Sequence, residues 1–255
     1  LQVQLFNRSH KRLDISEAGK QFYPKCKAIL LSINQAEEQL LLEQEAISGI
    51  ISITLSKALC RSKVLDAFAG FVSLYPLIKF DIFFSDKVED LYEKDIDFAF
   101  RLGQLNDSNT MVAMPLFEAQ LVACATPNYL QAHGVPKSFS EPGTAKFILT
   151  SELNPTGELK AFLNRERFDY TNSVSHTTND IEAVYQLTTS GLGIGLMLDV
   201  SIQKELDNGH FISVLSESKL PRKQLYLLSK KNQWQTNKQR AFKQYIENKL
   251  VELDI

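Results

Sequence analysis

Three short polar segments have residue types and positions that suit a small-molecule binding site. Ser56-Lys57, Ser85-Asp86 and Thr178-Asn179-Asp180 each follow a run of apolar residues that predicts a β-strand. In open α/β sheets, ligands bind outside the carboxyl ends of the strands, where the free N–H groups of a helix attract polar or anionic groups. Each segment would serve equally well as a helix cap, so none of them establishes a site alone.

Cys60 is the residue whose type would allow redox chemistry. It lies about one turn into the helix expected after Ser56, with Arg61 and Lys63 nearby in the sequence. A helix N-terminus and neighbouring cations lower the pKa of a thiol and so favour the reactive thiolate. The alternative is a buried cysteine that only packs, and the sequence leaves both interpretations open.

Motifs for catalysis or metal binding are absent from the sequence. It contains no HExxH, GxSxG or GxxxxGK[ST] motif. Gly191-Leu-Gly-Ile-Gly195 follows a predicted helix and leads into a strand, which reverses the order of a dinucleotide-binding loop. The histidines show no metal-ligand spacing: His10, His133, His176 and His210. The sequence therefore predicts no catalytic residues, no metal, no cofactor and no enzymatic activity.

Positive charge is concentrated at the beginning of the chain. Residues 1–27 hold six basic and two acidic residues, a net charge of +4. The whole chain of 255 residues has a formal net charge of −2, so the other 228 residues carry −6. A basic segment on an otherwise acidic chain suits contact of one end with a polyanion, and a solvated charged terminus is the alternative.

A long helix is predicted to follow this basic segment. Ser16 is suited to the N-cap and Glu17 to the first turn, and Gly49 ends the pattern. Such a helix of roughly 30 residues would be about 45 Å long. Apolar residues alternate at spacings of four and three, the 3.5-residue repeat of a coiled coil: Phe22, Cys26, Ile29, Ile33, Ala36 and Leu40. We expect the helix to pair with a second copy, the alternative being packing on its own globular part.

The residues from Ile50 onward alternate between strand and helix patterns. The predicted strands are Ile50–Leu55, Ile78–Phe84, Phe98–Arg101, Val112–Ala125, Phe147–Thr150, Val174–Thr178, Leu192–Leu198 and Gln224–Ser229. The predicted helices are Val64–Tyr75, Lys87–Tyr92, Asp180–Ser190 and a C-terminal helix with Phe242, Ile246, Leu250 and Leu253 on one face. This alternation predicts an α/β fold with a parallel or mixed sheet, arranged as two similar lobes with a cleft between them.

Composition points to a cytoplasmic protein. Hydrophobic residues make up 44% of the chain and charged residues 23%, close to the average of soluble globular proteins. No apolar stretch approaches the ~18–20 residues of a membrane span, and Leu1–Leu13 lacks the apolar core of a secretory signal. Three cysteines at wide spacing favour a reducing compartment. Because the sequence begins with Leu1, we expect it to be a fragment of a longer chain.

A series of short motifs runs along the chain from the basic segment to the second lobe. They are Phe6-Asn-Arg8, Leu13-Asp-Ile15-Ser-Glu-Ala-Gly19, Asp95-Ile-Asp97-Phe-Ala-Phe-Arg101-Leu-Gly103, Leu121-Val-Ala-Cys-Ala-Thr-Pro127-Asn-Tyr-Leu130, Asn179-Asp180-Ile-Glu-Ala183 and Gly191-Leu-Gly-Ile-Gly-Leu196. In order and spacing they resemble the pattern of LysR-type transcriptional regulators. The chain departs from that pattern at Leu198-Asp199, where the family often has a proline, and around Glu152–Gly157.

The resemblance implies a two-lobed effector domain like that of periplasmic binding proteins, preceded by a linker helix and the remnant of a winged helix-turn-helix. Residues 1–15 would be the wing remnant and 16–49 the dimerising helix. Residues 50–122 and 224–255 would form lobe I, and 123–223 lobe II. In this frame most of the helix-turn-helix, with the residues that read DNA bases, is expected upstream of Leu1.

The resemblance also implies partners and site residues. Double-stranded promoter or operator DNA, a small-molecule effector and further copies of the chain, as a homodimer and a homotetramer, would be the partners. Contacts to the DNA backbone would come from Arg8, Lys11 and Arg12. The effector pocket would draw on Ser56, Lys57, Ser85, Arg101, Thr126, Thr178, Asn179 and Met197. Lys57 and, less strongly, Arg101 favour an anionic effector, and the alternative for Arg101 is a structural ion pair.

Two other classes of protein share this fold. A solute-binding protein or sensor without DNA binding would need an export signal and no coiled-coil helix. An enzyme would need a catalytic constellation. We therefore expect a transcriptional regulator whose effector alters promoter binding or activation.

Overall fold

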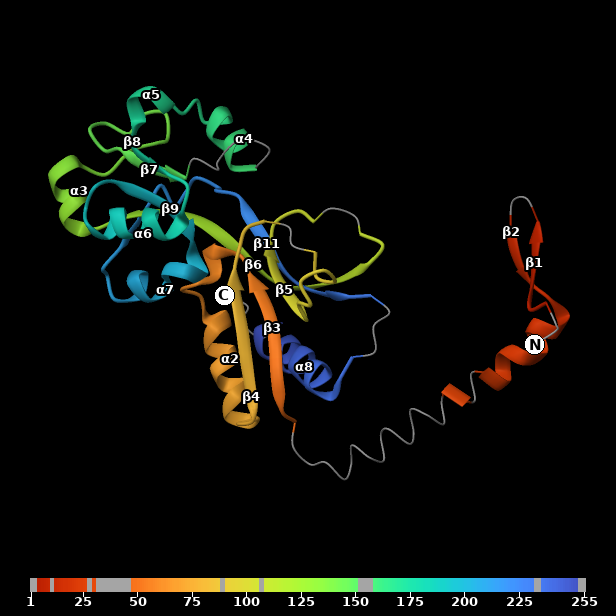
Figure 1. The fold of residues 1–255 in the computed structure, drawn as a ribbon. Coiled ribbons are helices and arrows are strands. Elements are labelled where there is room, and N and C mark those ends of the chain that lie inside the picture. The colour runs from red at the N-terminus through yellow and green to blue at the C-terminus, as the bar shows by residue number, and fades with distance from the viewer. Residues whose placement is uncertain are drawn as a thin grey trace. The chain divides into compact units, whose positions relative to one another are not determined.

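The structure is a computed structural model that describes residues 4–9, 12–26, 29–30, 47–87, 90–105, 108–150, 158–231 and 235–251 (Figure 1). The chain divides into two compact units, Leu1–Ala46 and Ile47–Ile255. In the described part of the chain, no helix is both long and apolar enough to cross a membrane.

The first unit contains a β-hairpin followed by a helix. Strands β1 (Phe6–Ser9) and β2 (Arg12–Ile15) pair antiparallel, and the helix covers residues 17–26 and 29–30. Ser16 Oγ accepts the Gly19 N–H at 3.0 Å, which confirms the predicted N-cap. A side chain at Gly19 would collide with the backbone carbonyl of Leu5, so a glycine lets the helix approach the hairpin closely. Helical residues predicted after position 30 lie outside the described residues.

The second unit is built on a nine-stranded mixed sheet with helices on its faces (Figure 1). Its strand order is β4-β3-β5-β11-β6-β9-β7-β8, with β10 also paired to β6. The strands of the first lobe are β3 (Gly49–Leu55), β4 (Ile78–Phe84) and β5 (Phe98–Leu102). Those of the second lobe are β7 (Phe147–Thr150), β8 (Val174–Thr178), β9 (Ile194–Leu198) and β10 (Ile212–Val214).

Two long strands connect the lobes. β6 (Met111–Ala125) pairs with β11 (Arg222–Lys230) along most of its length, and with β9 and β10 near its end. β11 also pairs with β5 of the first lobe. The lobe boundaries predicted at residues 122–123 and 223–224 fall inside β6 and β11, so the two lobes share strands.

Helices cover the sheet in both lobes. The first lobe has the 3-10 helix η1 (Lys57–Leu59), α2 (Lys63–Leu74) and α8 (Asn237–Val251). The second has α3 (Pro127–His133), α4 (Glu158–Arg165), α5 (Tyr170–Ser173), α6 (Ile181–Thr189) and α7 (Asp199–Asp207). Phe242, Ile246 and Leu250 of α8 are fully buried, as the helical spacing predicts. Phe242 packs edge-on to Phe68 and Phe71 of α2 and therefore joins the end of the chain to the first core.

The structure contradicts one predicted element and contains others that were not predicted. The described residues of the helix predicted at Lys87–Tyr92 are not helical, and 91–95 form turns, where the Asp90 carboxylate accepts the N–H groups of Tyr92 and Glu93. The elements that were not predicted are α3, α4, α5, α7 and β10. At α3, Pro127 suits the first helical position. At Leu198-Asp199 the chain enters α7 directly. The segment Glu152–Gly157 lies outside the described residues.

Candidate functional site

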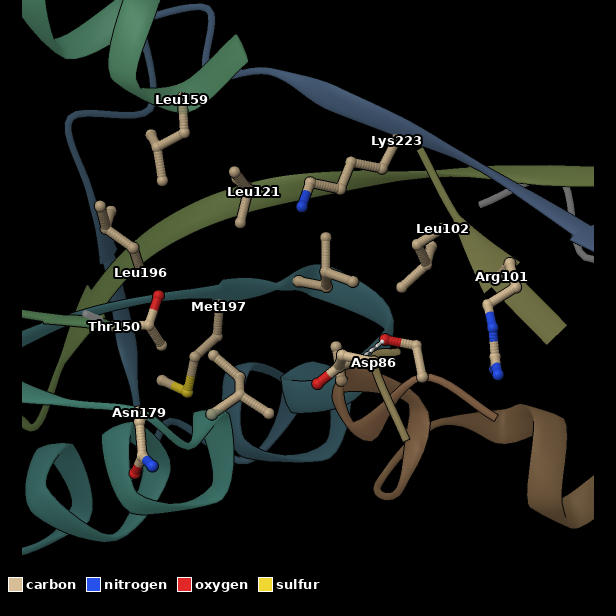
Figure 2. A pocket seen from close by; sticks show the side chains of 14 residues that line it. Asp86, Arg101, Leu102, Leu121, Thr150, Leu159, Asn179, Leu196, Met197 and Lys223 are labelled. Atoms are coloured by element: carbon tan, nitrogen blue, oxygen red, sulfur yellow. Dashed lines mark hydrogen bonds between the residues drawn. The ribbon is translucent and has the colours of Figure 1, made fainter. Parts of the chain in front are cut away.

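A cavity of about 310 Å³ lies between the two lobes of the second unit (Figure 2). Its lining combines the carboxyl ends of several strands with the shared strands β6 and β11. The apolar lining is aliphatic: Ala58, Leu102, Leu121, Leu159, Ile181, Leu196, Met197 and Leu198. The polar lining residues are Ser56, Asp86, Arg101, Thr150, Asn179 and Lys223. A mainly apolar cavity with a few oriented polar groups is the usual form of a small-molecule site.

One wall of the cavity is formed where β3 and β4 end. These strands are parallel neighbours, so Ser56 and Asp86, which follow them, meet at the same edge of the sheet. Ser56 Oγ donates to Asp86 Oδ1 at 2.5 Å, and the Lys57 N–H donates to the same oxygen at 3.0 Å. The backbone N–H at the start of η1, which the sequence offered to a ligand, therefore binds a carboxylate of the chain itself.

Arg101 lines the cavity from β5. Its guanidinium donates to Thr54 Oγ1 at 2.9 Å and to the carbonyl oxygens of Phe100 and Lys87 at 3.1 and 3.3 Å. These hydrogen bonds fix the position of the guanidinium. Arg101 thus holds β5 to Thr54 and to the backbone at Lys87.

Lys223 is a lining residue that the sequence analysis missed. Its side chain extends from β11 into the space beside Leu121 (Figure 2). Alternation along β11 gives a signal for it, since Lys223 shares a strand face with the buried residues Leu225 and Leu227. Arg222, one position earlier, is exposed and pairs with Glu118 at 3.5 Å.

The eight predicted pocket residues separate into two groups. Ser56, Arg101, Asn179 and Met197 line the cavity, whereas Lys57, Ser85, Thr126 and Thr178 do not. The hydroxyl oxygens of Ser85 and Thr178 accept the N–H groups of Lys87 and Asp180, both at 3.2 Å. Thr126 caps α3 by accepting the Tyr129 N–H at 3.4 Å, and it lines a separate open depression with Asn128 and His210.

Lys57 joins the two lobes instead of entering the cavity. Its Nζ lies 2.7 Å from Asp180 Oδ2, the residue that caps α6. The hydrogen bond from Lys57, supported by the Glu182 N–H, holds the pKa of Asp180 below its ordinary value.

Arg61 makes a second set of contacts between the lobes. Its guanidinium lies 2.9 Å from Glu205 Oε1, 3.6 Å from Glu182 Oε1 and 3.5 Å above the ring of Tyr185. The Tyr185 hydroxyl donates to the same Glu205 oxygen at 2.8 Å. Burial alone would raise the pKa of Glu205, but the hydrogen bonds from Tyr185 and Arg61 hold it below its ordinary value. We call Arg61, Tyr185, Glu182 and Glu205 the Arg61 cluster.

Cys60 lies beside a carboxylate of the second lobe. Its Sγ lies 3.5 Å from Glu182 Oε2. Burial, then the hydrogen bond to Glu182, raises the pKa of the Cys60 thiol to about 11. Arg61 lowers it less, because its guanidinium is shared between two carboxylates. A protonated thiol is a poor nucleophile, so these contacts favour the alternative of a cysteine that packs.

The predicted DNA contacts and the predicted absence of a metal site concern other parts of the chain. Arg8 and Arg12 lie on the paired strands of the first unit, and Lys11 is outside the described residues. Among the described residues, no cluster of three His, Cys, Asp or Glu side chains is arranged to hold a metal ion.

Comparison with known proteins identifies the family. Residues 44–250 match the LysR substrate binding domain. The HTH-type transcriptional regulator CrgA of Neisseria meningitidis is 29% identical over 230 residues, covering 85% of this chain and 72% of the relative. HTH-type transcriptional regulator DmlR of Escherichia coli is 25% identical and covers 85% and 71%.

Solved structures agree with this match. The full-length Vibrio cholerae virulence activator AphB, a member of the LTTR protein family, has a TM-score of 0.66 at 25% identity, covering 97% of this chain and 84% of that one. CrgA has a TM-score of 0.64 at 26% identity, with 98% and 83% coverage. The family match accounts for both the two-lobed fold and the order of the sequence motifs. The chain belongs to the LysR-type transcriptional regulators.

Proposed function

We propose that this regulator binds a small anionic effector in the cavity between its lobes, and that binding alters its action at a promoter. The observation that carries the proposal is the charge of the cavity lining. Lys223 supplies a cation, and Arg101 is a second basic residue of the lining. The only carboxylate among the described lining residues, Asp86, already accepts hydrogen bonds from Ser56 and Lys57. Positive charge in a low-dielectric cavity favours an anion.

The proposed effector contacts follow from the cavity lining. Ser56, Arg101, Asn179 and Met197, all expected from the sequence, would line the bound effector together with Lys223. Lys57 would act at the lobe interface through Asp180 rather than on the effector. An effector that binds one lobe arrangement better than another shifts the population toward it, by no more than its differential affinity.

The proposal extends to the first unit. Arg8, Lys11 and Arg12 would contact DNA phosphates, which give affinity and register rather than base recognition. The helix at residues 16–49 would pair with a second copy, and pairs of dimers would form a homotetramer. The protein would act in the cytoplasm.

Gel-shift titration of the native polypeptide on DNA flanking its own gene tests the proposal. Specific retardation that weakens between 50 and 200 mM salt, by roughly 10³-fold or more for six or more phosphate contacts, is expected. Addition of a binding anion should change the midpoint of the titration. Absence of specific retardation with and without small anions would refute the proposed function.

A further inference from the structure

Lys223 is chemically distinct from the other charged groups of the cavity. Among the residues that the structure describes, no carboxylate lies within ion-pair distance of its Nζ, and no hydrogen bond joins it to another described residue. The side chain is half-buried on the face of β11 that also carries the buried Leu225. A partly desolvated ammonium without a partner favours the binding of an anion that supplies one.

The remaining polar groups restrict the charge and shape of that anion. Arg101 is already held by Thr54 and by the carbonyl oxygens of Phe100 and Lys87. Asp86 lines the same cavity, so a second carboxylate on the ligand would meet a like charge. Leu121, Leu159 and Leu196 offer aliphatic surface between the polar groups. A cavity of about 310 Å³ is at the small end of the range for ligand sites. The ligand is therefore small, with one negative charge and an aliphatic body.

Uncharged polar groups lie at the other side of the cavity. Thr150 is the last residue of β7, and Asn179 directly follows β8, the parallel neighbour of β7. Both lie on the side of the cavity opposite Arg101 (Figure 2). In the described part of the chain, no side-chain hydrogen bond engages the Thr150 hydroxyl or the Asn179 amide. Both can donate and accept, so they suit a hydroxyl or amide group on the ligand.

We propose that Lys223 is the residue that selects the effector, and that the effector is a short aliphatic monocarboxylate with an uncharged hydrogen-bonding group at its far end. The carboxylate binds the Lys223 ammonium, the aliphatic body contacts the leucines, and the far group reaches Thr150 and Asn179. This inference rests on the proposed effector site and defines the chemistry of its ligand.

Calorimetric titration of the full chain with a defined panel of small molecules tests the inference. The acids are pentanoate, 5-hydroxypentanoate and 6-hydroxyhexanoate. Pentanol and pentanamide replace the carboxylate by neutral groups, and glutarate and adipate add a second carboxylate. The variants are Lys223→Met, which retains length without charge, and Lys223→Arg, which retains charge. Arg222→Met is the matched control, because Arg222 precedes Lys223 on the outward face of β11.

At least one hydroxy acid should bind wild type and Arg222→Met equally. Lys223→Met should weaken that affinity about tenfold or more, the usual effect of losing a hydrogen bond to a charged group, and Lys223→Arg should restore part of it. Neutral and doubly charged analogues should bind more weakly. Unchanged melting temperatures of the unliganded variants would show that folding is intact. If Lys223→Met melts at a lower temperature, the affinity retained in Lys223→Arg separates loss of charge from loss of folding.

Three results would overturn the inference: equal binding of an acid to wild type and Lys223→Met, tighter binding of a neutral or doubly charged analogue, or no binding of any panel acid. Each of these leaves the gel-shift test of the regulator unaffected. Conversely, acid binding that depends on Lys223 without any specific DNA retardation would refute the proposed function and leave the ligand assignment standing.

Discussion

At the scale of single residues, the polar groups near the cavity serve two different purposes. Ser56 donates to Asp86 and Arg101 donates to Thr54, so these side chains fix the strand ends as well as line the cavity. Lys223 has no such partner among the described residues and is available to a ligand. Substitution of Lys223 should therefore change ligand recognition with little effect on the strand ends.

Cys60 should react slowly with alkylating agents. With a pKa of about 11, its thiol is almost wholly protonated at pH 7. Iodoacetamide should modify it at least about tenfold more slowly in the native chain than in urea, and the rate should rise steeply between pH 9 and 11 because only the thiolate reacts. Site-resolved mass spectrometry separates Cys60 from Cys26 and Cys124. Equal rates in both states at pH 7 would contradict the raised pKa.

The contribution of the Lys57–Asp180 pair to stability should depend on pH. Since the folded-state pKa of Asp180 is lowered, the contribution is fully present above the ordinary Asp pKa of about 4 and is lost as pH falls through the lower folded value. Asp180→Asn removes the charge but keeps a capping side chain. Both partners are over a third exposed, so the loss at pH 7 should not exceed about 1 kcal/mol.

The measurement is the difference in unfolding free energy between wild type and Asp180→Asn from pH 7 down to pH 3. This difference should shrink toward zero at the acid end. A difference that stays constant across the range would assign the effect to the helix cap rather than to the ion pair.

At the scale of elements, η1 and the turn after it are tied to α6 and α7 of the other lobe. Arg61 contacts Glu205 and Tyr185, and the Ser201 hydroxyl donates to the carbonyl oxygen of Ala58. These contacts fix one arrangement of the lobes. The Arg61 cluster should therefore favour that arrangement energetically.

A double-mutant cycle of Arg61→Met and Glu205→Gln should give a coupling free energy of about 1.5–3 kcal/mol, as for hydrogen bonds to charged groups in partly buried sites. Arg222→Met and Glu118→Gln form the control cycle, because that pair is 65% and 55% exposed, against 34% and 13% for Arg61 and Glu205. The control should give less than about 1 kcal/mol. Equal coupling in the two cycles, measured by urea unfolding, would show that the Arg61–Glu205 pair is no stronger than an exposed ion pair.

The α/β alternation is readable from sequence because strands and helices bury residues at different periods. Such local patterns placed α2, β3, β4 and α8. They missed α3, α4, α5, α7 and β10. They also predicted a helix near Asp90, where a side chain replaces helical hydrogen bonds. The site was harder to predict. Lys223 is far in sequence from Ser56 and Asn179, and only the strand order of the sheet brings them to one cavity.

At the scale of the whole molecule, β6 and β11 run through both lobes and so connect the cavity to each of them. A ligand between the lobes contacts side chains of both and of the shared strands. Binding can therefore change the balance between lobe arrangements without breaking the sheet. An effector that changes the affinity for DNA requires that DNA change the affinity for the effector by the same factor.

The most direct measurement is the DNA affinity of the native polypeptide, by fluorescence anisotropy, with and without the tightest acid of the panel. The expected result is a change of about 5- to 150-fold in DNA affinity, matched by the same factor in acid affinity when DNA is added. Lys223→Met should bind DNA as wild type does without the acid and should need about tenfold more acid to respond. DNA affinity that stays constant while the acid saturates the cavity would contradict the assignment of this cavity as the effector site.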